Sequence, residues 1–170
     1  MREQLIEAVR GWGLPPEMVT FVIAMLPIVE LRGAIPWALT IGALEWPRAY
    51  MLSVLGNMIP VVPLLLFLGP VSAALRHITL FDRFFNWLFA RTRRRSLAFQ
   101  RYGALGLALF VAIPLPITGA WTGSAAAFLL GIPFRTAFPF IALGVCVAGV
   151  VVTAAVLGGV SLGGVLFSNH

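Results

Sequence analysis

Apolar residues dominate the chain in two long stretches, and each stretch consists of a broken segment followed by an unbroken one. The first broken segment covers 18–44, with two apolar pieces of about a dozen residues on either side of 30–33. Neither piece is long enough to cross a bilayer, because a spanning helix needs about 20 apolar residues. Pro27, Gly33 and Pro36 also disfavour a continuous helix here. The pattern therefore predicts a re-entrant helical hairpin that turns near 30–33 and leaves the bilayer on the side where it entered.

The segment after this hairpin, 49–75, is long enough to span. Gly56, Asn57, Pro60 and Pro63 interrupt it, which predicts a kinked or locally unwound helix. Inside a span, Asn57 is expected to find a hydrogen-bond partner on another helix.

The same pattern returns at 102–131, a second broken segment, and at 136–160, a second span. Matching residues of the two halves lie 87 to 89 positions apart: Pro27 and Pro116, Gly42 and Gly131, Arg48 and Arg135, Gly56 and Gly144. This offset indicates an internal duplication. A unit of one hairpin and one span crosses the membrane once, so its two copies must have opposite orientations, with both hairpin tips near the midplane.

The predicted fold class is an all-α integral membrane protein, built as an inverted repeat of a re-entrant helical hairpin plus a transmembrane helix, with amphipathic interfacial helices. It forms one membrane domain with these parts: an N-terminal interfacial helix at 1–16, repeat 1 at 17–75, a basic amphipathic connector at 76–101, repeat 2 at 102–160 and a C-terminal tail at 161–170. In the alternative, each broken segment crosses as a kinked helix, which gives four crossings and parallel repeats.

Composition and charge agree with a membrane protein. Hydrophobic residues make up 60% of the chain and charged residues 11%, with a mean hydropathy of +0.97, which excludes a soluble enzyme. The connector 76–101 holds seven of the twelve basic residues. By the positive-inside rule it is cytoplasmic, in a multi-pass protein of the inner (plasma) membrane. A topology signal explains this basic cluster better than nucleic-acid binding does. The expected partners are therefore membrane lipids and a small-molecule or lipid substrate. A homodimer is plausible, because a chain this short has little surface to enclose a transport path.

Glu30 and Arg32 are the acidic and the basic residue inside the first hydrophobic unit. A charge at the bilayer centre costs several kcal/mol unless it is paired or hydrated. Residues two apart do not face each other on a helix, so a direct pair requires non-helical backbone. The Glu30 carboxyl could exchange a proton during transport, and the Arg32 guanidinium suits a phosphate or carboxylate. In the simpler interpretation, the two charges neutralise each other and fix the tip.

The second tip offers small and polar groups. A half-helix that starts after Pro116 would direct its positive N-terminus at an anion. The predicted substrate-binding residues are Glu30, Arg32, Pro116, Thr118, Gly119, Trp121 and Thr122. The residues predicted to shape the tips are Pro27, Gly33, Pro36, Pro114 and Gly123. Close helix packing in membranes also needs such small residues, which is the competing interpretation.

Glu-Leu-Arg-Gly-Ala-Ile-Pro at 30–36, together with Pro-Leu-Pro-Ile-Thr-Gly-Ala-Trp-Thr-Gly at 114–123, resembles the small multidrug export protein family. The likeness covers about 18–160. The family is in turn similar in architecture to the DedA superfamily, with paired re-entrant hairpins and inverted repeats. Relatives of that type are implicated in moving phospholipids or polyprenyl-phosphate carriers, so the resemblance implies a transporter.

The sequence therefore predicts a small transporter that moves an anionic-headed substrate, such as a phospholipid or a polyprenyl-phosphate carrier, through the two tips, with proton coupling through Glu30. The alternatives are a small drug exporter and a non-transporting scaffold whose connector recruits partners. The sequence holds no nucleophile–base pair, no phosphate-binding loop and a single cysteine, Cys146. No enzymatic activity, cofactor or metal site is expected.

Overall fold

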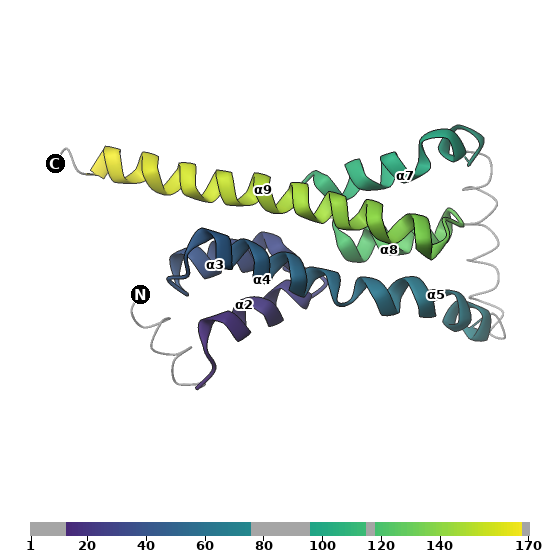
Figure 1. Ribbon diagram of the computed structural model, residues 1–170, viewed down its shortest axis with the longest axis horizontal. Helices are drawn as coiled ribbons and strands as arrows, with labels where there is room; N and C mark the ends of the chain where they lie inside the picture. The colour runs from purple at the N-terminus through teal and green to yellow at the C-terminus, as the bar shows by residue number, and fades with distance from the viewer. Residues whose placement is uncertain (1–12, 76–95, 115–117, 168–170) are drawn as a thin grey trace. The chain divides into compact units, whose positions relative to one another are not determined.

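A computed structural model describes residues 13–75, 96–114 and 118–167, whose regular structure is all α-helix (Figure 1). The all-α class is thus confirmed for these residues. Most of the predicted N-terminal helix, most of the basic connector and Pro116 lie outside them. The helices are α2 (Pro16–Met25), α3 (Glu30–Thr40), α4 (Trp46–Met58), α5 (Val61–Leu75), α7 (Ser96–Ala112), α8 (Ala120–Leu129) and α9 (Phe134–Phe167).

The chain divides into two compact units. The first combines the residues up to Asn57 with those from Cys146 onward, and the second runs from Met58 to Val145. The first unit therefore contains α2, α3, nearly all of α4 and the later part of α9. The second contains α5, α7, α8 and the beginning of α9.

In the first unit, α2 and α3 pack against each other as a helical hairpin (Figure 1). Helix α2 ends because Leu26 precedes a proline, Pro27, and such a residue is driven out of the helical region; its φ and ψ are −70° and 137°. The turn lies at 26–29, earlier than the predicted 30–33. Helix α3 then runs through Gly33 and Pro36, since one proline removes only one hydrogen bond of the helix.

In the second unit, α7 and α8 also pack against each other. A Cβ atom at Gly123 would lie 2.5 Å from Val111 Cγ2, so the absent side chain allows the close approach of α8 to α7. Helix α8 ends at a glycine cap: Gly131 has φ of +66°, and the N–H of Ile132 donates to the carbonyl of Ala127 at 2.9 Å. The second broken segment therefore folds back on itself as two helices.

Two helical stretches are long and apolar enough to cross a membrane, Trp46–Leu68 with 23 residues and Phe134–Gly159 with 26. At 1.5 Å per residue they measure about 34 and 39 Å, more than the roughly 30 Å of a hydrocarbon core. The first is interrupted between α4 and α5, next to Pro60, which confirms the predicted break.

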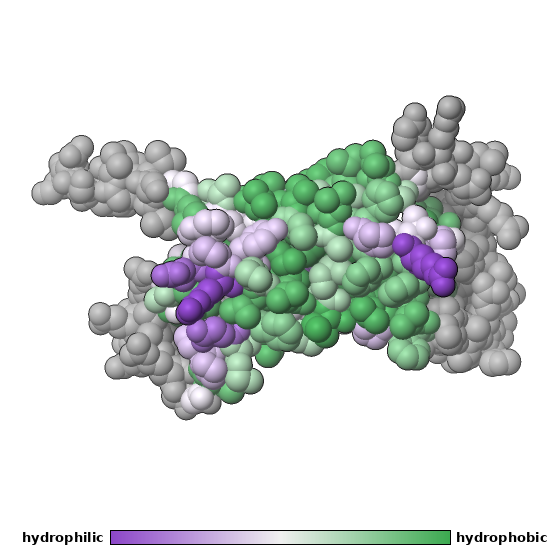
Figure 2. Space-filling model, in the orientation of Figure 1, coloured by the Kyte–Doolittle hydropathy of each residue, from purple (hydrophilic) through white to green (hydrophobic). Residues whose placement is uncertain are grey.

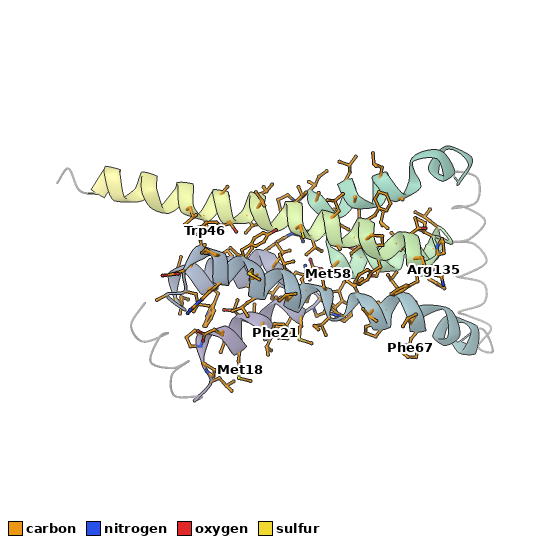
Figure 3. The ribbon with its side chains drawn as sticks, in the orientation of Figure 1. Met18, Phe21, Trp46, Met58, Phe67 and Arg135 are labelled. Atoms are coloured by element: carbon orange, nitrogen blue, oxygen red, sulfur yellow. The ribbon has the colours of Figure 1, made fainter. Side chains whose placement is uncertain are left out.

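The surface of these stretches is apolar. Figure 2 shows hydrophobic colouring along α4 and α9, and the exposed residues there include Met51 and Leu55 on α4 and Val147 and Val150 on α9. Arg48 and Arg135 are exposed in the first turns of α4 and α9, and Figure 3 places Arg135 near the start of its helix. Long cations at helix ends are typical of side chains that reach for a membrane interface.

Within each unit, a glycine joins the spanning helix to the first helix of the hairpin. A Cβ at Gly56 would lie 2.5 Å from the carbonyl oxygen of Phe21 on α2. A Cβ at Gly144 would lie 2.6 Å from the carbonyl oxygen of Ala108 on α7. These are two glycines that the sequence pattern predicts to be equivalent, and each makes the same kind of contact in its own unit.

Candidate functional site

The Glu30 carboxyl is buried at the start of α3. The residue is 3% exposed and has φ of +50°, a left-handed conformation that costs a residue with a side chain about 1–3 kcal/mol. The hairpin turn imposes this conformation, because the N–H of Glu30 donates to the carbonyl of Leu26 at 3.0 Å. An acidic side chain is thus held in a strained and buried position.

Arg32 pairs with this carboxylate. Its Nη1 atom lies 3.9 Å from Oε2 of Glu30, and the two side chains are 18% and 4% exposed. The separation exceeds hydrogen-bond distance, so the contact is an ion pair of opposite charges. The pair forms between residues two apart because Glu30 departs from helical φ, which is the condition that the sequence pattern predicted.

Hydroxyl groups at the second tip bond to nearby backbone. Thr118 donates its hydroxyl to the carbonyl of Ile113, and Thr122 donates to that of Gly119 at 3.3 Å. Gly119 caps the start of α8. Threonine commonly makes such local bonds at helix ends. They stabilise the backbone around Thr118 and Thr122.

The residues predicted to shape the tips lie at different positions along the hairpins. Pro27 is in the turn of the first hairpin, and Pro114 lies between α7 and α8. Gly33 and Pro36 are inside α3, and Gly123 is inside α8. These last three residues act within helices rather than in the turns.

Trp121 lines an apolar cavity in the second unit, where α8 packs against α5. The cavity has a volume of about 370 Å³, within the range of small-molecule sites. Its other lining residues come from α5 and the residue just before it: Pro60, Pro63, Leu64, Phe67 and Leu68. Figure 3 labels Phe67 on this helix.

The sequence analysis missed this cavity, although its signal is present. The five lining residues that precede Trp121 in the chain follow the spacing i, i+3, i+4, i+7 and i+8, which marks a single helix face. Pro60 and Pro63 by themselves predict only a break in the helix. Two prolines three residues apart on an apolar helix face together indicate that this face lines a cavity.

Two buried polar side chains of α4 belong to no predicted site. Ser53 is 0% and Asn57 is 1% exposed. Ser53 Oγ and both amide atoms of Asn57 have no hydrogen-bond partner among the described residues. The prediction that Asn57 pairs with another helix is therefore wrong for this arrangement of the chain.

A comparison with protein families places the sequence. The model of the family described as "Putative small multi-drug export protein" matches residues 30–151, most of the chain. The chain belongs to this family. The match begins at Glu30 and contains Arg32, the second tip and the apolar cavity. With two apolar spans and this family, the chain is a membrane protein. Comparisons with curated proteins and with solved structures found no match.

Proposed function

We propose that this chain is a membrane transporter that exports small, partly apolar compounds, with Glu30 as its coupling residue. The buried pair of Glu30 and Arg32 carries the proposal. Ionisable residues inside membrane segments are rare and costly, and they mark pathways for substrates, ions or protons. A buried ion pair adds little stability compared with apolar residues, so stability alone is a weak reason for its presence.

The lengths of α2 and α3 support a re-entrant architecture for the first hairpin. Helix α2 has 10 residues and α3 has 11, about 15 and 16 Å. Each reaches about half-way through a hydrocarbon core and folds back. The matching contacts of Gly56 and Gly144 support the view that the two halves are copies of one unit. If each copy crosses the membrane once, the two copies have opposite orientations.

The apolar cavity beside Trp121 supports a drug-like substrate. The surface that lines the cavity is apolar, and the indole N–H of Trp121 is the one polar group among the six lining side chains. A charged headgroup would therefore be poorly solvated there, whereas an aromatic or aliphatic compound would replace water or lipid at little cost. This observation, together with the family, favours small drug export over a lipid headgroup as the main function.

Proton coupling follows from the chemistry of the pair. A proton taken up by Glu30 removes the negative charge that holds Arg32, so the guanidinium is released. Loss of the proton restores the pair. The two protonation states thus correspond to two arrangements of the first hairpin tip, which is what coupling to a gradient requires.

Charge-neutral substitutions separate a functional pair from a structural one. Glu30→Gln and Arg32→Gln should each lower export of an aromatic cation, such as ethidium, from proteoliposomes by at least about tenfold. The double variant has no unpaired charge, and it should stay inactive because Glu30 carries the proton. Glu45→Gln, at an exposed acid, is the matched control. If the double variant recovers export, the pair only neutralises itself and the proposal is wrong.

An anionic-headed substrate is the second candidate, because Arg32 is the more exposed member of the pair, at 18% against 4%. A ligand would therefore meet the guanidinium first, and this group binds phosphates and carboxylates. Arg32→Ala discriminates between the two. Loss of anionic-lipid transport with unchanged drug tolerance supports the lipid function, and the reverse supports drug export.

A further inference from the structure

Ser53 and Asn57 present unused polar atoms on one face of α4. They are one helical turn apart, so their Cβ atoms are about 6 Å from each other. Three hydroxyls in the described helices bond to the carbonyl four residues earlier: Thr20 to Pro16 at 2.8 Å, Thr40 to Pro36 at 2.7 Å and Ser124 to Ala120 at 2.7 Å. Ser53 does not make this bond. The buried hydroxyl of Thr153 on α9 has no partner among the described residues either. Leaving such buried atoms without partners costs about 1–3 kcal/mol each, so a ligand that pairs them is favoured.

Helix α4 ends one residue after Asn57, so carbonyl oxygens at its end have no helical hydrogen bond. Position 60 is a proline and has no N–H, so the carbonyl of Gly56 receives no helical hydrogen bond from it. Carbonyls at a helix C-terminus carry a partial negative charge, which favours a cation. Asn57 is the next-to-last residue of α4. We infer that Ser53 and Asn57, next to this negatively polarised end of α4, bind a small monovalent cation, for which Na⁺ is the probe.

The type of ligand follows from the donor set. Neutral oxygens of a hydroxyl and an amide suit hard cations, and the nearby helix end supplies only about half a negative charge. A divalent ion would need several carboxylates, and the described residues contain no group of three or more His, Cys, Asp or Glu. An anion is repelled by the carbonyl end. The amide NH₂ of Asn57 can donate to a water that the ion retains.

Ser53 and Asn57 belong to the first unit, which also holds the ion pair of Glu30 and Arg32. Gly56, next to Asn57, contacts Ala24 near the end of α2, with its added Cβ 3.0 Å from the Cβ of Ala24. That end of α2 leads directly through the turn to Glu30. Cation binding goes beyond the proposed export function and does not depend on it.

Binding of ²²Na⁺ to the purified full chain in detergent tests the inference, together with thermal unfolding in NaCl and in choline chloride at equal ionic strength. We expect saturable ²²Na⁺ binding and a melting temperature higher by about 5 °C in NaCl at 100 times the Kd. Asn57→Leu and Ser53→Ala should weaken Na⁺ binding at least about tenfold. Asn57→Asp keeps an oxygen at the same place and should retain the Na⁺ dependence. Ser124→Ala, at a buried serine that is already paired, should bind Na⁺ like the wild type.

Equal melting temperatures in both salts and no saturable ²²Na⁺ binding would overturn the inference, and would leave a bound water as the partner of these atoms. Undiminished ²²Na⁺ binding by both Asn57→Leu and Ser53→Ala would overturn it as well. If Asn57→Leu does not fold, Ser53→Ala and Asn57→Asp decide. No transport is measured, so an inactive exporter leaves the result unaffected, and a failed cation site leaves the proposed export function standing.

Discussion

The indole of Trp121 is the aromatic wall that α8 contributes to the cavity beside α5. Replacing it with alanine should raise the concentration of an aromatic compound needed for half-maximal export about 2- to 10-fold, because an aromatic contact contributes about 0.5–1.5 kcal/mol beyond its area. Trp121→Phe keeps a ring and should remain close to wild type. Trp46→Ala, at a tryptophan that is 56% exposed, is the control. An equal effect of Trp46→Ala would mean that the cavity does not hold the substrate.

Single residues differ in how much of their role could be predicted from the sequence. Glu30 and Arg32 stand out in the sequence because a charge in an apolar segment is costly wherever its neighbours lie, and the structure shows them as an ion pair. Their roles in substrate binding and proton coupling stay predictions. Asn57 was expected to be paired, and that was wrong. Whether an amide finds a partner depends on which side chain faces it across helices, and no local pattern specifies this.

At the scale of helices, the contacts of Gly56 and Gly144 predict that substitution of either glycine destabilises the protein to a similar extent. Gly56→Ala and Gly144→Ala each place a methyl group within 2.6 Å of a backbone oxygen, so the helices must move apart. Each should lower the free energy of unfolding by about 1–3 kcal/mol. Gly158→Ala, on the same helix as Gly144 but with nothing within 4 Å, should be neutral or slightly stabilising. Thermal unfolding of the three purified variants measures this, and a destabilised Gly158→Ala would contradict the packing argument.

Some helix boundaries depend on local sequence, and others depend on packing between helices that are not adjacent in the sequence. Proline chemistry alone predicts the breaks near Pro27 and Pro60, and both are present. The first turn was placed too late because Gly33 and Pro36 were also interpreted as breakers. Packing of α3 against α2 keeps both residues helical, and such tertiary support overrides intrinsic propensity. The cavity was not predicted because its sixth lining residue, Trp121, comes from a segment that is distant in the sequence.

For the whole molecule, the periodicity of apolar segments predicted an all-helical membrane chain, and the described residues and the family bear this out. The inverted orientation of the two halves stays a prediction. Sequence offsets indicate that segments correspond, but orientation depends on which side of the membrane each connection occupies. That is a property of insertion into a bilayer, which charge patterns bias without fixing.

Accessibility of single cysteines tests this orientation. The background Cys146→Ala retains the backbone carbonyl that accepts the Tyr50 hydroxyl at 3.1 Å, so it should fold normally. In it, Thr92→Cys should react with an impermeant maleimide only from inside, because the positive-inside rule predicts a cytoplasmic basic connector. Cysteines in place of Glu3, Trp46 and Ser168 should react only from outside, since each half then crosses once. The unlabelled background is the control. If positions 3 and 46 react from opposite sides, the first hairpin crosses the membrane, and the two halves have parallel orientation.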